Sequence, residues 1–402
     1  MKTSNNKINF YFIILLAVFT VYLFNILVFH INFEELIGVK GLLVNYDGGF
    51  IRRGLLGEII TSLSLNFLFQ IKNIFTSLHL INYILFFSLN YYLFKKFEKN
   101  FLFYFFIFSP IYLFYPLVAV TTKYAEHIIQ REAYILTMFL SLVILNLNYK
   151  NRKLVLVLSL MTVVFSTFLY ELTILCYPFF FTIYYIFLKK NNFSINYFEI
   201  LIALFICSSL IIFHLSFYGE NNLTLMIDNL NSNFGFNYKN SDLLYSWLNK
   251  DISKQIIFFI GGFKLNYILK YLFYSHPIIL LIIINHNFIE DKIYLFLFNI
   301  SILSFTVVFA IATDWARFVH ILYSLCLITF AFYFYSEKKD IFINKGKSVL
   351  LKLRISPKIA NLIVFIYCII WNLKHTYWQN HLSYAFFKII KQNLLYFNEL
   401  IF

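Results

Sequence analysis

Long apolar runs follow one another along most of this chain of 402 residues, and short polar or basic segments separate them. Within the runs, apolar residues do not alternate with polar ones, as they would in the strands of a membrane barrel. A run of about 20 apolar residues has the length of a helix that crosses a bilayer. The pattern therefore predicts an all-α polytopic transmembrane helical bundle with about 11 spans, in which residues 1–402 form a single integral membrane domain.

The predicted spans follow from the positions of the apolar runs. They cover residues 10–30, 74–94, 101–120, 132–149, 154–170, 172–188, 197–217, 271–288, 293–312, 318–335 and 359–373. The first run is too long for the hydrophobic region of a signal peptide, and no Ala-x-Ala-like site follows it. We therefore interpret it as an uncleaved span with the N-terminus inside, which places the C-terminus outside.

Composition supports a membrane protein and argues against several other classes. The chain is 61% hydrophobic with 53 Phe and 31 Tyr, and its mean hydropathy of +0.74 excludes an ordinary soluble protein. The net charge of +14 does not indicate nucleic acid, because the lysines lie in short tracts between the apolar runs. The four cysteines fall inside predicted spans without the spacing of a metal site or a disulfide framework. We expect neither a cofactor nor a metal.

The distribution of charge predicts the orientation of the bundle. With the N-terminus inside, the inner side carries 18 of the 33 basic residues but only six of the 19 acidic ones, as the positive-inside rule requires. Three outer segments are long: extracytoplasmic loop 1 (31–73), a second loop (218–270) and a C-terminal tail (374–402). In loop 1, Ile51–Phe69 resembles a helix lying along the membrane surface, and we expect residues 256–270 to return along the interface. These features predict a multi-pass membrane protein with its three long segments on the outer side.

One polar stretch, from Val44 to Glu58, stands out from this background. It holds Asp47, two adjacent arginines and Glu58, and six of the chain's eleven glycines fall within residues 38–57. Glycine permits unusual backbone angles or a close approach to a ligand. A helix that starts near Phe50 would also direct free N–H groups towards an anion. The stretch is therefore interpreted as a binding loop.

Most other ionisable residues besides lysine lie at the predicted outer face. Four separate segments supply them: Asp47, Arg52, Arg53 and Glu58; Glu126, His127, Arg131 and Glu132; Glu171; and Asp314, Arg317 and His320. Charged groups at this depth are costly and often functional. Residues spaced three or four apart share a helix face, as His127 and Arg131 do. Each pair alone is also explained as an ion pair at a helix end, so the convergence of all four segments favours one site.

Arginine is the informative residue, because lysine supplies almost every inner charge. A planar guanidinium binds phosphate oxygens bidentately, which indicates a phosphate or diphosphate ligand. The expected substrate-binding residues are Arg52, Arg53, Glu126, His127, Arg131, Arg317 and His320. The catalytic candidates are Asp47, Glu171 and Asp314, acting as a base on an acceptor hydroxyl or stabilising positive charge at an anomeric carbon. For Asp47, the alternative is an N-cap or an Asx turn before Gly48.

The order of these features resembles the GT-C class of glycosyltransferases that use lipid-linked sugars. It is also similar to the Wzy-type polymerases of O-antigen and capsule assembly, which depend on outward-facing arginines. The resemblance rests on the run from Asp47 to Leu55, on Arg131-Glu132 and on Asp314-Trp315-Ala316-Arg317. It implies a GT-C-like fold, with Asp47 as the loop acid and Arg52, Arg53, Arg131 and Arg317 as polymerase-like arginines.

Together with these features, the resemblance implies a glycosyltransferase of a bacterial inner (cytoplasmic) membrane whose active site faces the periplasm. It would act on polyprenyl-diphosphate-linked sugars, most simply as a polysaccharide polymerase. Its expected partners are a polyprenyl-(di)phosphate-linked sugar, a glycan acceptor and membrane lipids, with no nucleic acid. A flippase for lipid-linked oligosaccharides, or another transporter, is the alternative, although transporters usually place their charges near the middle of the membrane. A membrane acyl- or phosphate-group transferase would share the same phosphate site.

Overall fold

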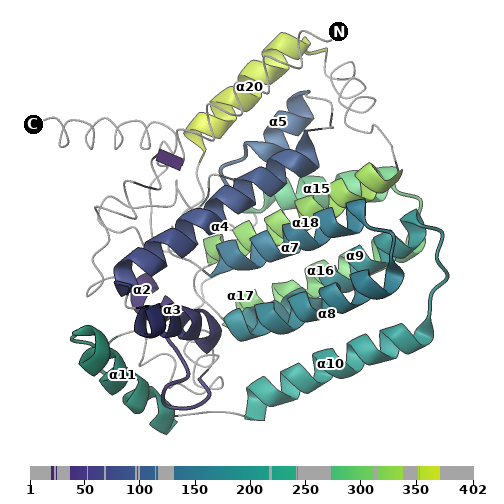
Figure 1. Cartoon of the computed structure of the whole chain (residues 1–402). Helices are drawn as coiled ribbons and strands as arrows, with labels where there is room; N and C mark the ends of the chain where they lie inside the picture. Colours follow the sequence, from purple (N-terminus) through teal and green to yellow (C-terminus); the bar gives the residue numbers. More distant parts are fainter. Residues whose placement is uncertain are drawn as a thin grey trace, which may run out of the picture.

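The computed structural model describes residues 20–21, 24, 37–51, 53–67, 69–95, 97, 100–113, 115, 131–216, 220–240, 242, 273–311, 315–337, 352 and 354–371. Over these residues the chain is helical and contains no strand (Figure 1). The helices are α2 (Ile37–Leu42), α3 (Gly54–Phe67), α4 (Ile71–Phe94), α5 (Phe101–Ile107), α7 (Glu132–Asn148), α8 (Arg152–Leu169), the 3-10 helix η2 (Glu171–Cys176), α9 (Tyr177–Lys190), α10 (Tyr197–Ser216), α11 (Glu220–Phe234), α15 (His276–Phe288), α16 (Lys292–Thr306), α17 (Val308–Ile311), α18 (Trp315–Glu337) and α20 (Pro357–Ile370).

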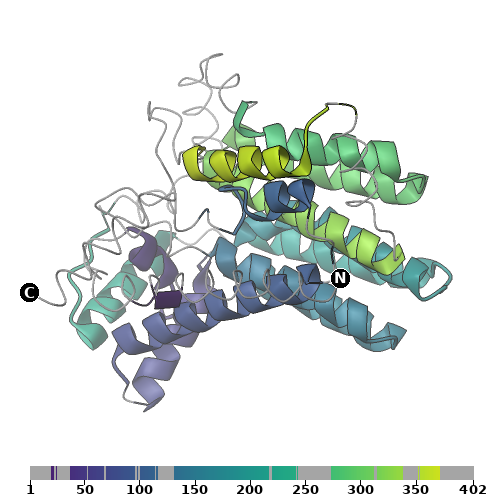
Figure 2. The same ribbon diagram turned by 90° about the horizontal axis from the view of Figure 1, so that it is seen from above.

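The centre of the bundle is α18, a helix of 23 residues. It packs against α7, α9, α15 and α16 (Figures 1 and 2). Side chains around its whole circumference are buried, from Phe318 at 2% exposure to Phe334 at 1%. A helix that is apolar on all sides can be accommodated only inside a larger bundle. Helix α18, which carries Arg317 in its first turn, is therefore surrounded by the other helices.

Outer helices present apolar side chains to their surroundings. On α10, Leu201 is 62% exposed and Phe205 is 72% exposed, and α20 exposes a similar row that includes Phe365. Apolar faces of this extent are unfavourable in water but suit contact with lipid chains. In the described part of the chain, five helical segments have the length and composition to cross a membrane: Ile71–Phe94, Arg152–Leu169, Glu171–Lys190, Tyr197–His214 and Trp315–Ser336. A multi-pass membrane protein is therefore supported, while the count of 11 spans stays a prediction.

Several predicted spans differ from the observed helices. The expected helix over 101–120 ends at Ile107, and the chain then turns through Ser109 to Leu113. Pro110 explains this break, because proline lacks an N–H group and disfavours helical geometry in the residue before it. The span at 293–312 is divided between α16 and α17, and that at 271–288 begins at His276. The loop at 218–270 contains α11, a helix that its polar sequence did not suggest. The first span lies largely outside the described residues, as do the segment 256–270 and the tail 374–402.

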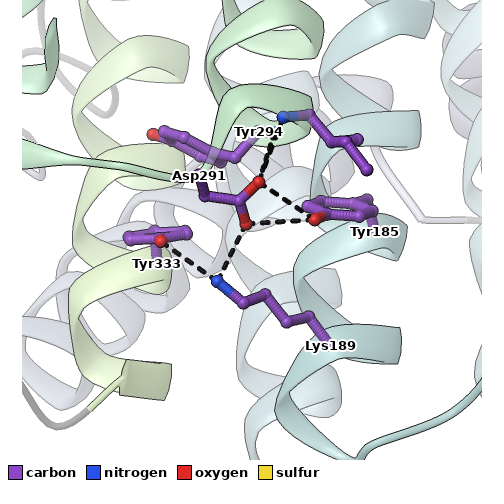
Figure 3. A network of polar contacts seen from close by, with 6 residues as sticks. Tyr185, Lys189, Asp291, Tyr294 and Tyr333 are labelled. Carbon is purple, nitrogen blue, oxygen red and sulfur yellow. Dashed lines mark hydrogen bonds and ion pairs between the residues drawn. The ribbon is translucent and has the colours of Figure 1, made fainter.

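Polar contacts join the helices at one end of the bundle, which we call the basic end and define by Arg152, Lys189 and Lys190. Lys189 Nζ lies 2.8 Å from Asp291 Oδ2 and 3.3 Å from the Tyr333 hydroxyl (Figure 3). The Asp291 carboxylate also caps α16, accepting from the N–H groups of Ile293 and Tyr294. These contacts fix α9, α16 and α18 relative to one another.

Candidate functional site

The opposite end of the bundle gathers an arginine cluster, consisting of Arg53, Arg131, Glu132, Tyr170, Glu171 and Arg317. Arg53 precedes α3, Arg131 and Glu132 start α7, Tyr170 and Glu171 connect α8 to η2, and Arg317 lies in the first turn of α18. Four segments that are far apart in the sequence therefore meet here. Each of them contributes the N-terminal end of a helix, and the partial positive charge at such ends favours negative groups.

The tightest contact in the cluster joins Arg53 to Glu171. Arg53 Nε lies 2.8 Å from each carboxylate oxygen, and Nη2 lies 2.5 Å from Oε1. Burial opposes the charged form of Arg53, but the charge and hydrogen bonding of Glu171, together with Tyr170, outweigh burial and raise the pKa of the guanidinium. Arg53 also has a left-handed backbone with φ of 70°, which is rare for residues other than glycine. The chain therefore holds this guanidinium in a fixed position.

Arg317 is held by a second carboxylate and by a tyrosine. Its Nε lies 3.1 Å from Glu132 Oε1, and the Glu132 side chain is only 4% exposed. Its Nη2 donates to the Tyr170 hydroxyl at 3.2 Å. The ring of the same tyrosine lies 4.9 Å from the guanidinium carbon of Arg53, within the range of a cation–π contact. Tyr170 therefore links the two arginines.

Arg131 differs from the other two arginines because no carboxylate pairs with it among the described residues. The residue is 7% exposed. Its Nε and Nη2 have no hydrogen-bond acceptor in the described part of the chain. Burial, and after it the positive charge of Arg53, lowers the pKa of Arg131 to about 10. Buried guanidinium donors without acceptors are uncommon, so this is the position where an anionic ligand gains most.

The loop before α3 is closed by two glycines. A Cβ atom on Gly57 would lie 2.0 Å from the carbonyl oxygen of Val44, and one on Gly54 would lie 2.2 Å from the ring of Tyr46. The sequence suggested that these glycines allow a ligand to come close. At these two positions they instead allow the helix to pack closely against Val44 and Tyr46 of the same loop. Helix α3 begins at Gly54 rather than near Phe50, because the chain first turns from Tyr46 to Gly49, whose φ is 108°.

Asp47 lies on this loop with its side chain exposed to solvent. Its carboxylate accepts from Asn45 Nδ2 at 3.0 Å, and no ion pair joins it to an arginine among the described residues. Burial and the negative charge of Glu58 raise the pKa of Asp47. Its neighbour Tyr46 experiences the positive charge of Arg131, so the loop adjoins the cluster. A catalytic role for Asp47 stays a prediction.

The remaining candidates divide into two groups. His320 is buried on α18, where its Nδ1 contacts the carbonyl oxygen of Ile111 at 2.7 Å and its ring stacks on Tyr115 at 4.6 Å. These described contacts are internal packing, and none of them brings His320 to the arginine cluster. Four other candidates lie outside the described residues: Arg52, Glu126, His127 and Asp314.

The sequence did not single out Tyr170, although a signal was present. Tyr170 directly precedes Glu171 at the junction of two apolar runs, where a buried tyrosine hydroxyl needs a partner. Over the described residues, no group of three histidine, cysteine, aspartate or glutamate side chains could hold a metal ion.

The charges of the arginine cluster suit a negatively charged group. Three guanidinium groups face two carboxylates, so the cluster carries one positive charge in excess. A phosphate group bound by Arg131 would offset that charge and supply the missing acceptors. Comparisons of the chain with protein-family models, with curated proteins and with solved structures find no match.

Proposed function

We propose that this protein is a membrane glycosyltransferase that uses polyprenyl-diphosphate-linked sugars at the outer face of a bacterial cytoplasmic membrane, most simply as a polysaccharide polymerase. One observation carries the proposal: three arginines from separate segments meet around two carboxylates, and the buried Arg131 lacks hydrogen-bond acceptors among the described residues. The apolar faces of the bundle suit a substrate whose lipid chain stays in the bilayer.

In this proposal the arginines hold the phosphate that leaves. Arg131 donates hydrogen bonds to its oxygens, while Arg53 and Arg317 supply charge from positions fixed by Glu171 and Glu132. Preorganised donors are effective because they need no rearrangement as charge develops on the leaving group. Tyr170 keeps Arg53 and Arg317 together as the substrate binds.

The transfer itself requires a base. An acceptor hydroxyl attacks the anomeric carbon, the bond from that carbon to the phosphate oxygen breaks, and the polyprenyl diphosphate leaves with the electron pair. The hydroxyl proton passes to a carboxylate, for which Asp47 is the first candidate because its raised pKa makes it a better base than an ordinary aspartate. Glu171 and Asp314 are the other candidates.

The test uses purified full-length protein in lipid nanodiscs with a synthetic polyprenyl-diphosphate-linked oligosaccharide carrying a radiolabel. We expect lengthened lipid-linked product from the native protein. In Arg131→Gln the rate of transfer should fall at least about 100-fold, as it does when other preorganised donors to a developing charge are removed. Arg354→Gln is the matched control, because Arg354 is exposed and lies far along the sequence from the cluster segments. Equal rates for both variants would refute the role of Arg131.

A lipid-linked oligosaccharide transporter is the second candidate, since an arginine without acceptors could also hold a phosphate in transit. The position of the cluster at one end of the bundle favours the enzyme, because transporters usually bind at mid-membrane. A fluorescent lipid-linked oligosaccharide in proteoliposomes distinguishes them: movement between leaflets without any new glycosidic bond would assign transport.

A further inference from the structure

An open cleft of about 520 Å³ lies where the end of α3 and the start of α4 meet the end of α11. The residues around it are Ser64, Leu65, Phe69, Gln70, Ile71, Lys72, Asn233, Phe234 and Phe236. We refer to it as the α11 cleft. Figure 1 shows α3, α11 and the start of α4 together at the lower left of the bundle, and Arg53 of the arginine cluster directly precedes α3. The cleft therefore belongs to the same end of the bundle as the proposed phosphate site.

Aromatic rings form both walls of the α11 cleft. On one side Phe69 is 62% exposed and stacks with Phe67 at 6.5 Å between ring centroids. On the other side Phe236 lies between Phe234, at 6.2 Å, and Tyr238, at 4.8 Å. The face of an aromatic ring is negative and attracts polarised C–H groups, such as those on the flat side of a sugar ring.

The wall formed by Phe236 is fixed in place by its own backbone. Gly235 ends α11 with φ of 69°, a left-handed C-cap that turns the chain back on the helix. The side chain of Asn231 then binds Tyr238 twice: Nδ2 donates to the carbonyl oxygen and Oδ1 accepts from the N–H group, both at 2.9 Å. Phe236 is held inside this turn, so the wall exists before a ligand arrives.

The polar residues of the cleft match hydroxyl groups. Gln70 and Asn233 are exposed and carry amides that both donate and accept hydrogen bonds. The Ser64 hydroxyl donates to the carbonyl oxygen of Phe69 at 2.6 Å and retains its lone pairs as acceptors. A lipid chain would leave these groups without partners, at a cost of about 1–3 kcal/mol each. A saccharide satisfies them.

We propose that the α11 cleft binds saccharide units of the glycan acceptor. Sugar rings lie against Phe69 and Phe236, and Gln70 and Asn233 bind their hydroxyls. The binding of saccharide is independent of the glycosyltransferase proposal, but the role of that saccharide as acceptor rests on it. The volume of the cleft lies within the usual range of about 300–1,000 Å³ for small-ligand sites.

The test measures saccharide binding to full-length protein in nanodiscs by saturation-transfer difference NMR. The probes are oligosaccharides released by mild acid from the producing cell's own surface glycan, and dodecanoate tests for a lipid chain. We expect Asn233→Ala and Phe236→Ala to weaken oligosaccharide binding about tenfold, as loss of one or two contacts predicts. Phe198→Ala is the matched control, because Phe198 on α10 is an aromatic residue that is 68% exposed elsewhere.

Four outcomes are distinguishable. Weaker oligosaccharide binding in both cleft variants, with Phe198→Ala and Arg131→Gln unchanged, supports the cleft. Unchanged binding in Asn233→Ala, an exposed position where folding is not at risk, overturns it. A dodecanoate signal that is lost in the cleft variants, with no oligosaccharide signal from the native protein, also overturns the proposal and assigns a lipid chain to the cleft. If the cleft variants lose oligosaccharide binding but the native protein performs no glycosyl transfer, the cleft is supported and the proposed function is refuted.

Discussion

Arg53 and Glu171 are 118 positions apart in the sequence, yet three nitrogen–oxygen contacts of 2.5 to 2.8 Å join their side chains. This pair connects the loop before α3 to the junction of α8 and η2. Glu171 neutralises the charge of Arg53. Arg53 is therefore fixed near the ligand position, while Arg131 is the arginine whose donors lack acceptors among the described residues. The division between paired and unpaired arginines leads to the first three predictions.

Removing one partner of the Arg53–Glu171 pair should destabilise the protein more than removing both. Arg53→Gln removes the guanidinium that contacts the partly buried carboxylate of Glu171, which costs about 1–3 kcal/mol. The double variant with Glu171→Gln should recover part of that loss. Chemical unfolding in detergent across a double-mutant cycle measures the coupling, and additive losses would contradict a direct interaction.

Replacing Arg131 should have the opposite effect on the unliganded protein. Arg131→Gln removes a buried charge that no described carboxylate pairs with, so the free energy of unfolding should stay constant or rise by about 1 kcal/mol. The same change should remove protection by inorganic diphosphate. Thermal unfolding with and without diphosphate gives both values, and a large loss of stability without ligand would show that Arg131 supports the fold instead.

Alkaline pH should weaken anion binding, because Arg131 should lose its proton at a lower pH than Arg53 does. The pKa of Arg131 is lowered to about 10, so this guanidinium loses its proton as pH rises through that value, while the pKa of Arg53 is raised. The lowered value also means that charging Arg131 opposes folding below pH 10, and that this penalty disappears at higher pH. The shift in unfolding temperature caused by diphosphate should therefore decline above about pH 10 in the native protein.

A methyl group at position 57 should disturb the loop that carries Asp47. In Gly57→Ala the new Cβ atom would meet the carbonyl oxygen of Val44 at 2.0 Å, so the backbone must move, at a cost of about 1–3 kcal/mol. Transfer should fall together with stability. Asn66→Ala on the same helix is the control, since Asn66 is exposed. Wild-type behaviour of both variants would contradict the close contact.

The sequence predicted the helices and the convergence of charge for identifiable reasons. Apolar runs at 74–94, 132–149 and 154–170 coincide with α4, α7 and α8 because burial in lipid or protein favours helices in any such run. Arg53, Arg131 and Arg317 could be assigned to one end of the bundle because alternating spans fix the side on which each helix starts.

Other features depend on contacts that no local pattern contains. The pairing of Glu171 with Arg53, and of Glu132 with Arg317, is decided by helix packing across more than a hundred positions. The turn after Ile107 reflects Pro110, which interrupts a helix inside a long apolar run. Helix α11 was missed because its apolar residues, among them Leu223, Met226 and Leu230, form a narrow stripe among asparagines.

The backbone at Arg53 has a consequence for how this position tolerates change. A left-handed residue with a side chain is disfavoured by about 1–2 kcal/mol, and glycine at the same place would relieve that strain. The neighbouring position is already glycine, so the turn could have been built from two glycines at little cost. A glycine at position 53 would relax the backbone but abolish the ion pair with Glu171, so the strain of this turn and the pairing of the two segments cannot be separated by one substitution.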